Sequence, residues 1–389
     1  MLRTFSLSDV IIPWSLIPHG QLTQLKIVCE TFTADFLPRS NLNQLIDLLV
    51  NCPDLEFLVL DSCLPSRLAQ FPYDQTIYLP RLSHLFLAGP SSHITNLLKM
   101  LKMPPSTILQ LFCVSEHNST DNDYFLLHVL STHLQRSASV EFKRLNITIS
   151  LVGSFLEVNA STSLSTSRTY RCKDDGFVLL FEGLPENGNW TDLIKRVCNM
   201  LHISNLKFLS ISDPPGIVDP IFWVEVFERR CTKVTTIEAI GRGTSSLVRA
   251  LATPKVTNNG RGGRVEAARH DDDESTPAQA TWSSAPVSIF PKLAYMLLKK
   301  MDFAENKPPL GILSDIVQEV LREHTGMEAD GTLKMLRIEN CNISAKRAKA
   351  LEKIVPKFHW DGKENFSDDC DEGVYRGGPW WEESFDGAS

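Results

Sequence analysis

Residues 333–343, LKMLRIENCNI, carry the pattern that decides the fold. Leu333, Leu336, Ile338, Cys341 and Ile343 match the leucine-rich-repeat pattern L-x-x-L-x-L-x-x-[N/C]-x-L position by position. In this pattern a short strand and a tight turn line one edge of a stacked array. One such strand cannot bury its apolar side chains alone, so the stretch predicts neighbouring units of the same kind.

The same spacing recurs along the chain, and segments of helical period lie between the matches. The strand-like matches fall at residues 2–7, 22–27, 55–60, 82–87, 108–113, 206–211, 234–239 and 293–298. Apolar residues at helical spacing occupy residues 42–49, 94–101, 123–134, 190–201, 221–230 and 313–321. This alternation predicts an α/β fold: a leucine-rich-repeat-like solenoid, an irregular horseshoe with a concave parallel sheet and outer helices.

Two segments depart from the repeat. Residues 138–185 combine VEFKRLNITISL and FVLLFEG with the polar stretch NASTSLSTSRT, which indicates irregular strands joined by a long loop. Residues 253–288 are rich in Gly, Pro, Ser, Thr and charge, which predicts a disordered insertion. We therefore divide the chain into a solenoid (1–252), the insertion (253–288), further solenoid repeats (289–360) and an acidic, Trp-containing tail (361–389).

The two ends of the chain pose separate questions. A match to the repeat begins at Leu2, although solenoids need an end cap, so we interpret Met1 as a truncated start or else a bare edge. The tail admits two interpretations: a frayed segment, or one whose Trp380 and Trp381 fold back to cap the last repeat.

Charge argues against nucleic acid as a partner. The net charge is −7, and residues 361–389 alone hold nine Asp or Glu against two Lys or Arg. The rest of the chain is therefore neutral overall and offers no broad basic field to a polyanion. The composition predicts neither nucleic-acid nor membrane partners.

Cysteine usage and the absence of sorting signals indicate a reducing compartment. The nine cysteines are scattered and include no C-x-x-C pair, which favours buried thiols over disulfides or a zinc ribbon. No signal-peptide pattern opens the sequence, and no apolar run is long enough to cross a bilayer. We expect a cytoplasmic or nuclear protein.

No residue pattern supports catalysis, a cofactor or a metal ion. The acidic run 270–274 (HDDDE) and the basic patch 260–264 (GRGGR) lie in the predicted insertion and are interpreted as solvated charge. Residues 241–246 (GRGTSS) lack the Lys and spacing of a phosphate-binding loop and indicate a turn with a helix cap. His84, His128 and His202 fall on or beside predicted elements, where structural roles are expected.

The expected function is therefore a non-enzymatic protein-protein interaction scaffold. A solenoid presents its strands on a broad concave face, and specificity would reside on the outward positions of those strands. Candidate positions of this kind are Lys334, Met335, Arg337, Glu56, Phe57 and Val59.

Several stretches resemble one family: PWSLIPHGQLTQLKI, LLVNCPDLEFLVL, LPRLSHLFLAG and LRIENCNISAKRAKALEKIVPKFHWDG with the acidic Trp-rich tail. Together they resemble the carboxyl-terminal leucine-rich part of F-box proteins of mushroom-forming fungi. The resemblance implies a substrate-recognition role in a ubiquitin ligase. It also implies a Skp-type adaptor as partner, but only if an F-box lies upstream of Met1, because none precedes Leu2.

Two alternatives stay open on the sequence. The first is a truncated orphan repeat protein with no ligase role. The second is an unrecognised hydrolase or transferase within residues 138–185.

Overall fold

Strands dominate the architecture. The computed structural model describes residues 2–10, 13–18, 20–29, 42–64, 76–116, 120–136, 140–150, 154–164, 176–185, 189–212, 218–251, 289–304, 313–325 and 333–364. Thirteen of the strands in this part of the chain form one sheet: β1 Thr4–Ser8, β2 Gln24–Val28, β3 Phe57–Asp61, β5 His84–Pro90, β7 Ile108–Val114, β8 Arg144–Ser150, β9 Phe155–Ser161, β10 Gly176–Glu182, β11 Phe208–Ser212, β12 Thr236–Ile240, β13 Tyr295–Lys299, β14 Met335–Glu339 and β15 Lys357–Trp360. The short strands β4 (Ile77–Tyr78) and β6 (Leu101–Lys102) pair with each other in a second sheet.

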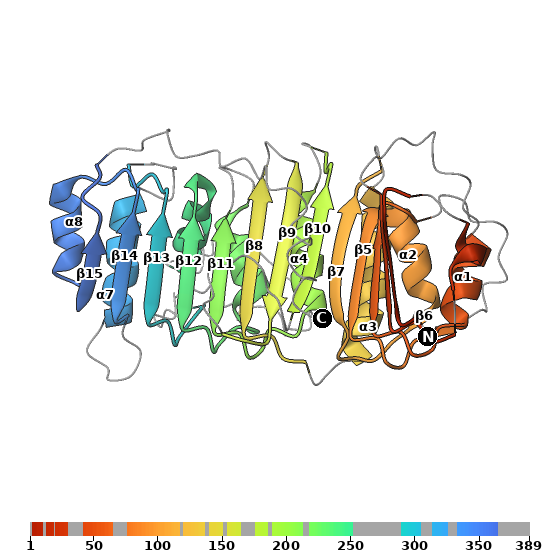
Figure 1. Cartoon of the computed structure of the whole chain (residues 1–389). Helices are drawn as coiled ribbons and strands as arrows, with labels where there is room; N and C mark the ends of the chain where they lie inside the picture. The colour runs from red at the N-terminus through yellow and green to blue at the C-terminus, as the bar shows by residue number, and fades with distance from the viewer. Residues whose placement is uncertain are drawn as a thin grey trace, which may run out of the picture.

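Helices lie behind the large sheet in Figure 1, and the strands face the viewer. The described α-helices are α1 Leu42–Val50, α2 Ser91–Met100, α3 Thr120–Arg136, α4 Trp190–Met200, α5 Pro220–Phe227, α6 Ser245–Leu251, α7 Leu313–Thr325 and α8 Ala345–Glu352. The fold is therefore α/β, with a large and mostly parallel sheet, as the alternating pattern predicted. The short 3-10 helices η1 (Trp14–Leu16) and η2 (Arg242–Thr244) complete the described elements.

The core lies between the sheet and the helices. All five repeat-pattern positions of residues 333–343 are buried. The matching leucines of β2, β3 and β5 are buried as well, since alternate strand residues point towards the helices. At the outer strand β1, by contrast, Phe5 and Leu7 are only partly buried.

Local sequence sets where the helices begin. The Asn189 side chain accepts a hydrogen bond from the Asp192 amide at 3.1 Å, which caps the start of α4. The Asp219 carboxylate accepts from the Ile221 amide at 2.7 Å, and Pro220 occupies the first position of α5, where no amide hydrogen is needed.

The sheet is not wholly parallel, which corrects the expected concave parallel sheet. Its order is β1-β2-β3-β5-β7-β10-β9-β8-β11-β12-β13-β14-β15, and β9 runs antiparallel to both β8 and β10. The reason is local: only four residues separate β8 from β9, a connection too short for a parallel crossover. The loop predicted around residues 159–169 is thus partly wrong, because Asn159, Ala160 and Ser161 belong to β9.

The order of strands continues across residues 253–288. β12 and β13, which flank that segment in sequence, pair in parallel with Ile237 opposite Met296. The predicted disordered insertion itself lies outside the described residues, as do Trp380 and Trp381. The first tail residues contact the last unit: the carboxylate of Asp361 accepts from the Asn340 amide at 2.6 Å, and that of Glu364 from the Ala345 amide at 3.0 Å.

A left-handed residue follows six strands of the large sheet. Asp9, Ser62, Gly183, Gly241, Lys300 and Asn340 each have positive φ and each come directly after a strand. The amides of Gly241 and Lys300 then donate to the last carbonyl of the next strand, at Lys299 and Glu339. This turn ends the strand and adds one more backbone hydrogen bond between it and the neighbouring strand.

Substitution of Lys300 measures the free-energy cost of a left-handed residue in that turn. Its φ of 56° is unfavourable for a side chain with a Cβ. We expect Lys300→Gly to raise the free energy of unfolding by about 0.5–1 kcal/mol, after the entropy that glycine adds to the unfolded chain. Chemical denaturation measures it, and Lys299→Gly within β13 is the control, expected to destabilise by about 0.5–1 kcal/mol. Equal destabilisation by both variants would contradict this assignment.

The described cysteines behave as small apolar residues. All seven are free and buried: Cys29, Cys52, Cys63, Cys113, Cys198, Cys231 and Cys341. Burial raises the pKa of the Cys198, Cys231 and Cys341 thiols to about 12, so these thiols are protonated at neutral pH. Cys341 donates to the carbonyl oxygens of Leu298 and Glu339, so it contributes to the turn after β14.

Candidate interaction surface

The face of the large sheet turned away from the helices is the broadest surface that strands contribute, and we call it the open face (Figure 1). Its side chains alternate with the buried leucines, so each strand supplies every second residue. Strand register places these residues side by side: Phe57 lies opposite His84, and His84 opposite Ile108.

Apolar and aromatic side chains gather on the open face of β3, β5, β7 and β10. We define this apolar patch as Phe57, Val59, Phe86, Ile108, Phe112, Val114, Val178 and Leu180, of which Phe86 and Val178 are buried. The Phe86 and Phe112 rings lie 5.2 Å apart, and the Phe57 ring stacks on His84 with centroids 4.5 Å apart. Val114 at the end of β7 keeps 39% of its surface exposed.

Polar and charged side chains are more frequent on the open face from β9 to β15, where they alternate with Phe155, Phe208, Ile240, Tyr295, Leu297 and Met335. Asn159 donates to the Glu157 carboxylate at 2.8 Å, and the Arg144 guanidinium lies 4.2 Å from the centre of the Phe208 ring. On β14, Arg337 forms an ion pair with Glu339. The side formed by β3, β5, β7 and β10 is therefore the more apolar half and the side from β9 to β15 the more polar half, and the two halves meet between β10 and β9.

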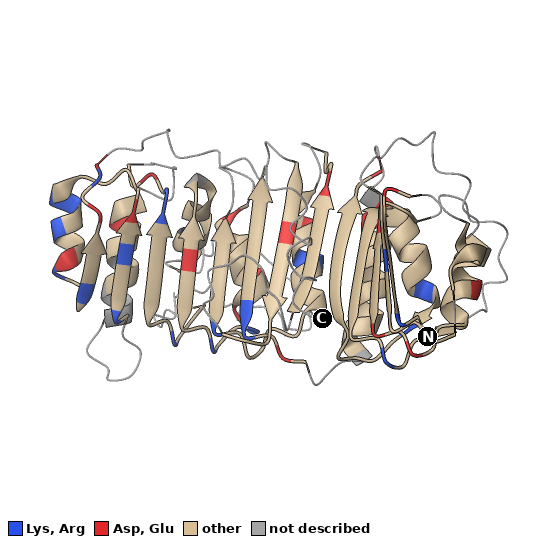
Figure 2. Ribbon diagram, viewed as in Figure 1, with Lys and Arg blue, Asp and Glu red and all other residues tan. Residues whose placement is uncertain are grey.

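Charge follows the same division (Figure 2). The strands β3, β5, β7, β10 and β9 contain Asp61, Glu182 and Glu157 and no Lys or Arg. The strands from β8 to β15 contain four Lys or Arg and two Glu: Arg144, Lys299, Arg337, Lys357, Glu238 and Glu339. The apolar half thus carries Asp61 and Glu182 and no Lys or Arg, while on the flanking strands β9 contributes Glu157 and β2 contributes Lys26, which lies opposite Val59.

Four of the six candidate positions predicted from sequence lie on the open face. Phe57 and Val59 belong to β3, and Met335 and Arg337 to β14. Glu56 and Lys334 instead precede these strands, and the carbonyl oxygens of both accept backbone hydrogen bonds from the next unit. The two groups that the pattern identified are far apart in the strand order, at opposite ends of the sheet.

The structure adds a buried polar cluster that the sequence analysis missed. The Asp123 carboxylate accepts hydrogen bonds from the Ser91 hydroxyl at 2.5 Å and the Ser115 hydroxyl at 2.6 Å. Burial raises the pKa of Asp123, and the two hydroxyls oppose that rise. Nearby Glu116 accepts from Ser92 at 2.8 Å and from Asn122 at 2.6 Å. Because these residues start α2 and α3 or follow β7, the cluster joins two consecutive units.

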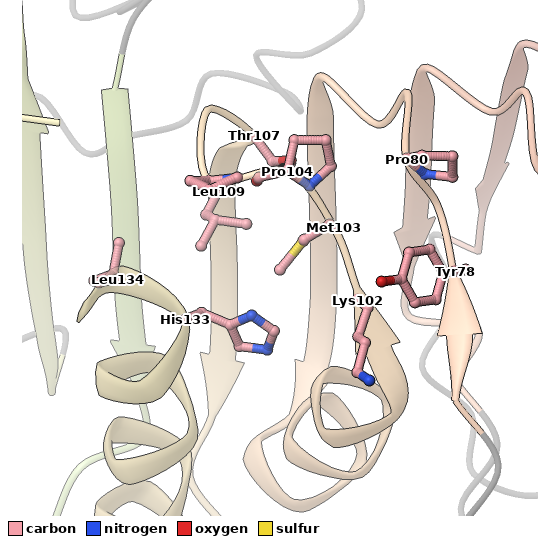
Figure 3. Close-up of a pocket in the computed structure, with 10 residues that line it drawn as sticks. Tyr78, Pro80, Lys102, Met103, Pro104, Thr107, Leu109, His133 and Leu134 are labelled. Atoms are coloured by element: carbon pink, nitrogen blue, oxygen red, sulfur yellow. Dashed lines mark hydrogen bonds between the residues drawn. The ribbon is translucent and has the colours of Figure 1, made fainter. Parts of the chain in front are cut away.

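A pocket of about 340 Å³ opens beside the second sheet (Figure 3). It is lined by Tyr78, Pro80, Lys102, Met103, Pro104, Pro105, Thr107, Leu109, His133 and Leu134. The His133 ring lies 3.1 Å from the Leu98 carbonyl oxygen, and the Thr107 hydroxyl donates to the Leu82 and Pro104 carbonyls. These polar side chains bond to backbone, so they hold the pocket walls in place.

The other residues considered from sequence do not converge on a common site. Thr244 and Ser246 are buried, and their hydroxyls donate to the carbonyls of Gly241 and Gly243 within the turn. His84 stacks on Phe57, whereas His128 is exposed on α3 and His202 follows α4. Residues 260–264 and 270–274 lie outside the described part of the chain.

The residues that the structure describes contain neither a metal-binding cluster nor a helix that could span a membrane. No group of three or more His, Cys, Asp or Glu side chains among these residues is placed to hold a metal ion. Within the same residues, none of the helices has the length and apolar character needed to span a membrane.

No protein-family model matches the chain, and no curated protein matches it significantly.

Proposed function

We propose that this protein is a non-enzymatic scaffold that binds a protein partner on the open face of a leucine-rich-repeat-like solenoid. One observation carries the proposal: the open face places an apolar patch next to a polar, charged half. Protein interfaces combine an apolar centre with a polar surround in this way. The long row of parallel strands with helices on one side, and the turn repeated after six strands, support the solenoid interpretation.

Substitution of open-face clusters tests the proposal. The first variant combines Val59→Asn with Leu180→Asn on the apolar patch, and the second combines Met335→Ala with Arg337→Ala on β14. We expect at least one of them to lower capture of the partner about 10-fold or more, because a few central residues dominate interface energy. Circular dichroism and denaturation midpoints check that each variant is folded. If variants of several such clusters still capture the partner, the open face is not the binding surface.

The resemblance to fungal F-box proteins supports a narrower proposal. In it the scaffold is the substrate-recognition portion of a ubiquitin-ligase subunit, and adaptor binding depends on an F-box encoded upstream of Met1. Sequencing the 5′ end of the transcript tests this directly. In-frame F-box-like codons, followed by co-purification with a Skp-type adaptor, would support the ligase role. A transcript that starts just before Met1 would contradict it and leave the scaffold proposal intact.

A further inference from the structure

We propose that the partner segment bound by this scaffold is basic and apolar, and that it lies on the apolar patch with its cationic side chains at Glu157 and Glu182. The inference rests on the proposed function and specifies the chemistry of the partner. It follows from how strand register places carboxylates against the patch.

Register puts a carboxylate beside two residues of the patch, Leu180 and Val114. Glu157 of β9 pairs with Leu180 of β10, and Glu182 at the end of β10 pairs with Val114 of β7. Glu182 is exposed and Glu157 is half-buried. A side chain bound over Leu180 or Val114 therefore has a carboxylate on the neighbouring strand.

The charged residues on the surrounding strands leave Glu157 and Glu182 available to a cationic side chain. Among β3, β5, β7, β10 and β9 no Lys or Arg occurs. On the flanking strands Lys26 of β2 lies opposite Val59 and Arg144 of β8 lies opposite Ser161, so neither cation is paired in register with Glu157 or Glu182. Asn159, which donates a hydrogen bond to the Glu157 carboxylate, is neutral and leaves the charge in place. A polyanion would be repelled here, whereas a segment with Lys or Arg next to large apolar residues matches the patch in both charge and polarity.

A phage-displayed library of random peptides, selected on the full chain, supplies the probe. We expect the selected peptides to be enriched in Lys or Arg next to aromatic or aliphatic residues. One selected peptide is then synthesised, and its affinity is measured by fluorescence anisotropy at two salt concentrations. Binding should weaken as salt rises, because these carboxylates are near the surface.

Charge-neutral variants locate the contact. Combining Glu157→Gln with Glu182→Gln keeps the size of both side chains and should weaken binding about 3- to 10-fold, with a smaller dependence on salt. Leu180→Asn should weaken binding about 10-fold or more, whereas Leu180→Met should retain it. Glu238→Gln on β12 is the matched control, since it removes a carboxylate from the polar half of the same face and should leave affinity unchanged.

The outcomes separate this inference from the proposed function. Selection of acidic peptides, failure to select any peptide, or unchanged affinity in the Glu157/Glu182 double variant would overturn the inference. If binding is lost only in Met335→Ala or Arg337→Ala on β14, the inference fails while the scaffold proposal stands. If no open-face variant affects any selected peptide, both fail.

Discussion

Trp223→Ala is expected to lower the free energy of unfolding by about 4 kcal/mol, which is the largest single-residue effect we predict. Trp223 is fully buried on α5, and its ring stacks on Phe227 at 5.8 Å with an interplanar angle of 3°. Its indole N–H donates to the Ser246 hydroxyl at 2.8 Å and so ties α5 to α6. Truncation would leave a cavity between two helices and remove this hydrogen bond.

Denaturant-induced unfolding followed by circular dichroism measures the effect, and Trp223→Phe is its control. Phenylalanine keeps most of the apolar volume and loses the hydrogen bond, so we expect a cost of about 1–2 kcal/mol. A loss of less than 1 kcal/mol for Trp223→Ala would show that α5 does not pack on the core in this way.

Asp123→Ala is the second large effect, with an expected loss of about 2–4 kcal/mol. The substitution removes an acceptor from two buried hydroxyls: Ser115 loses the carboxylate, and Ser91 keeps only its 3.5 Å contact with the Val114 carbonyl. A buried hydroxyl left without a partner costs about 1–3 kcal/mol. Asp123→Asn keeps the shape and an acceptor oxygen, so we expect a change within about 1 kcal/mol at neutral pH. Equal losses in both variants would contradict this role of the carboxylate.

The difference in unfolding free energy between the native chain and Asp123→Asn should depend on pH, and the raised pKa fixes the direction of that dependence. Burial raises the pKa of Asp123 above its ordinary value of 3.8, so the folded state binds the proton more tightly than the unfolded state. The contribution of Asp123 to stability is therefore greatest below pH 3.8 and is lost as the pH rises through the raised pKa. The unfolding free energy of the native chain minus that of Asp123→Asn should fall as the pH rises from 4 to 8. An increase over that range would show that the carboxylate is stabilised as the anion.

The repeat pattern predicted most strands and helices because both periodicities depend on local burial. Leu336 and Ile338 point into the core of their own unit whatever neighbours that unit has, so the sequence alone places them. The antiparallel strand β9 was missed because residues 155–161 run into a Ser-rich stretch that suggested a loop. Their alternation, with Leu156, Val158 and Ala160 buried, was the signal that could have identified the strand.

The candidate surface was predictable only in part. Phe57 and Val59 follow from the pattern of one strand. The patch also needs Leu180 of β10. This residue lies beside β7 only because β10, and not the next strand in sequence, β8, pairs with β7. The Asp123 cluster joins residues separated by 32 positions, and a serine after β5 or β7 resembles any other turn residue in sequence. Such features depend on topology, which periodicity does not encode.

Side-chain footprinting of the chain, free and bound to a captured partner or selected peptide, tests the central claim most directly. Hydroxyl radicals modify accessible aromatic side chains, and the chain offers exposed ones on both sides, with Phe57 partly exposed. Phe57 and Tyr295 lie on the open face, whereas Phe125 on α3 and Tyr78 on β4 do not. We predict that binding protects Phe57, Tyr295 or both while Phe125 and Tyr78 react as before. Protection of Phe125 and Tyr78 alone would place the partner on the helical side and contradict the account.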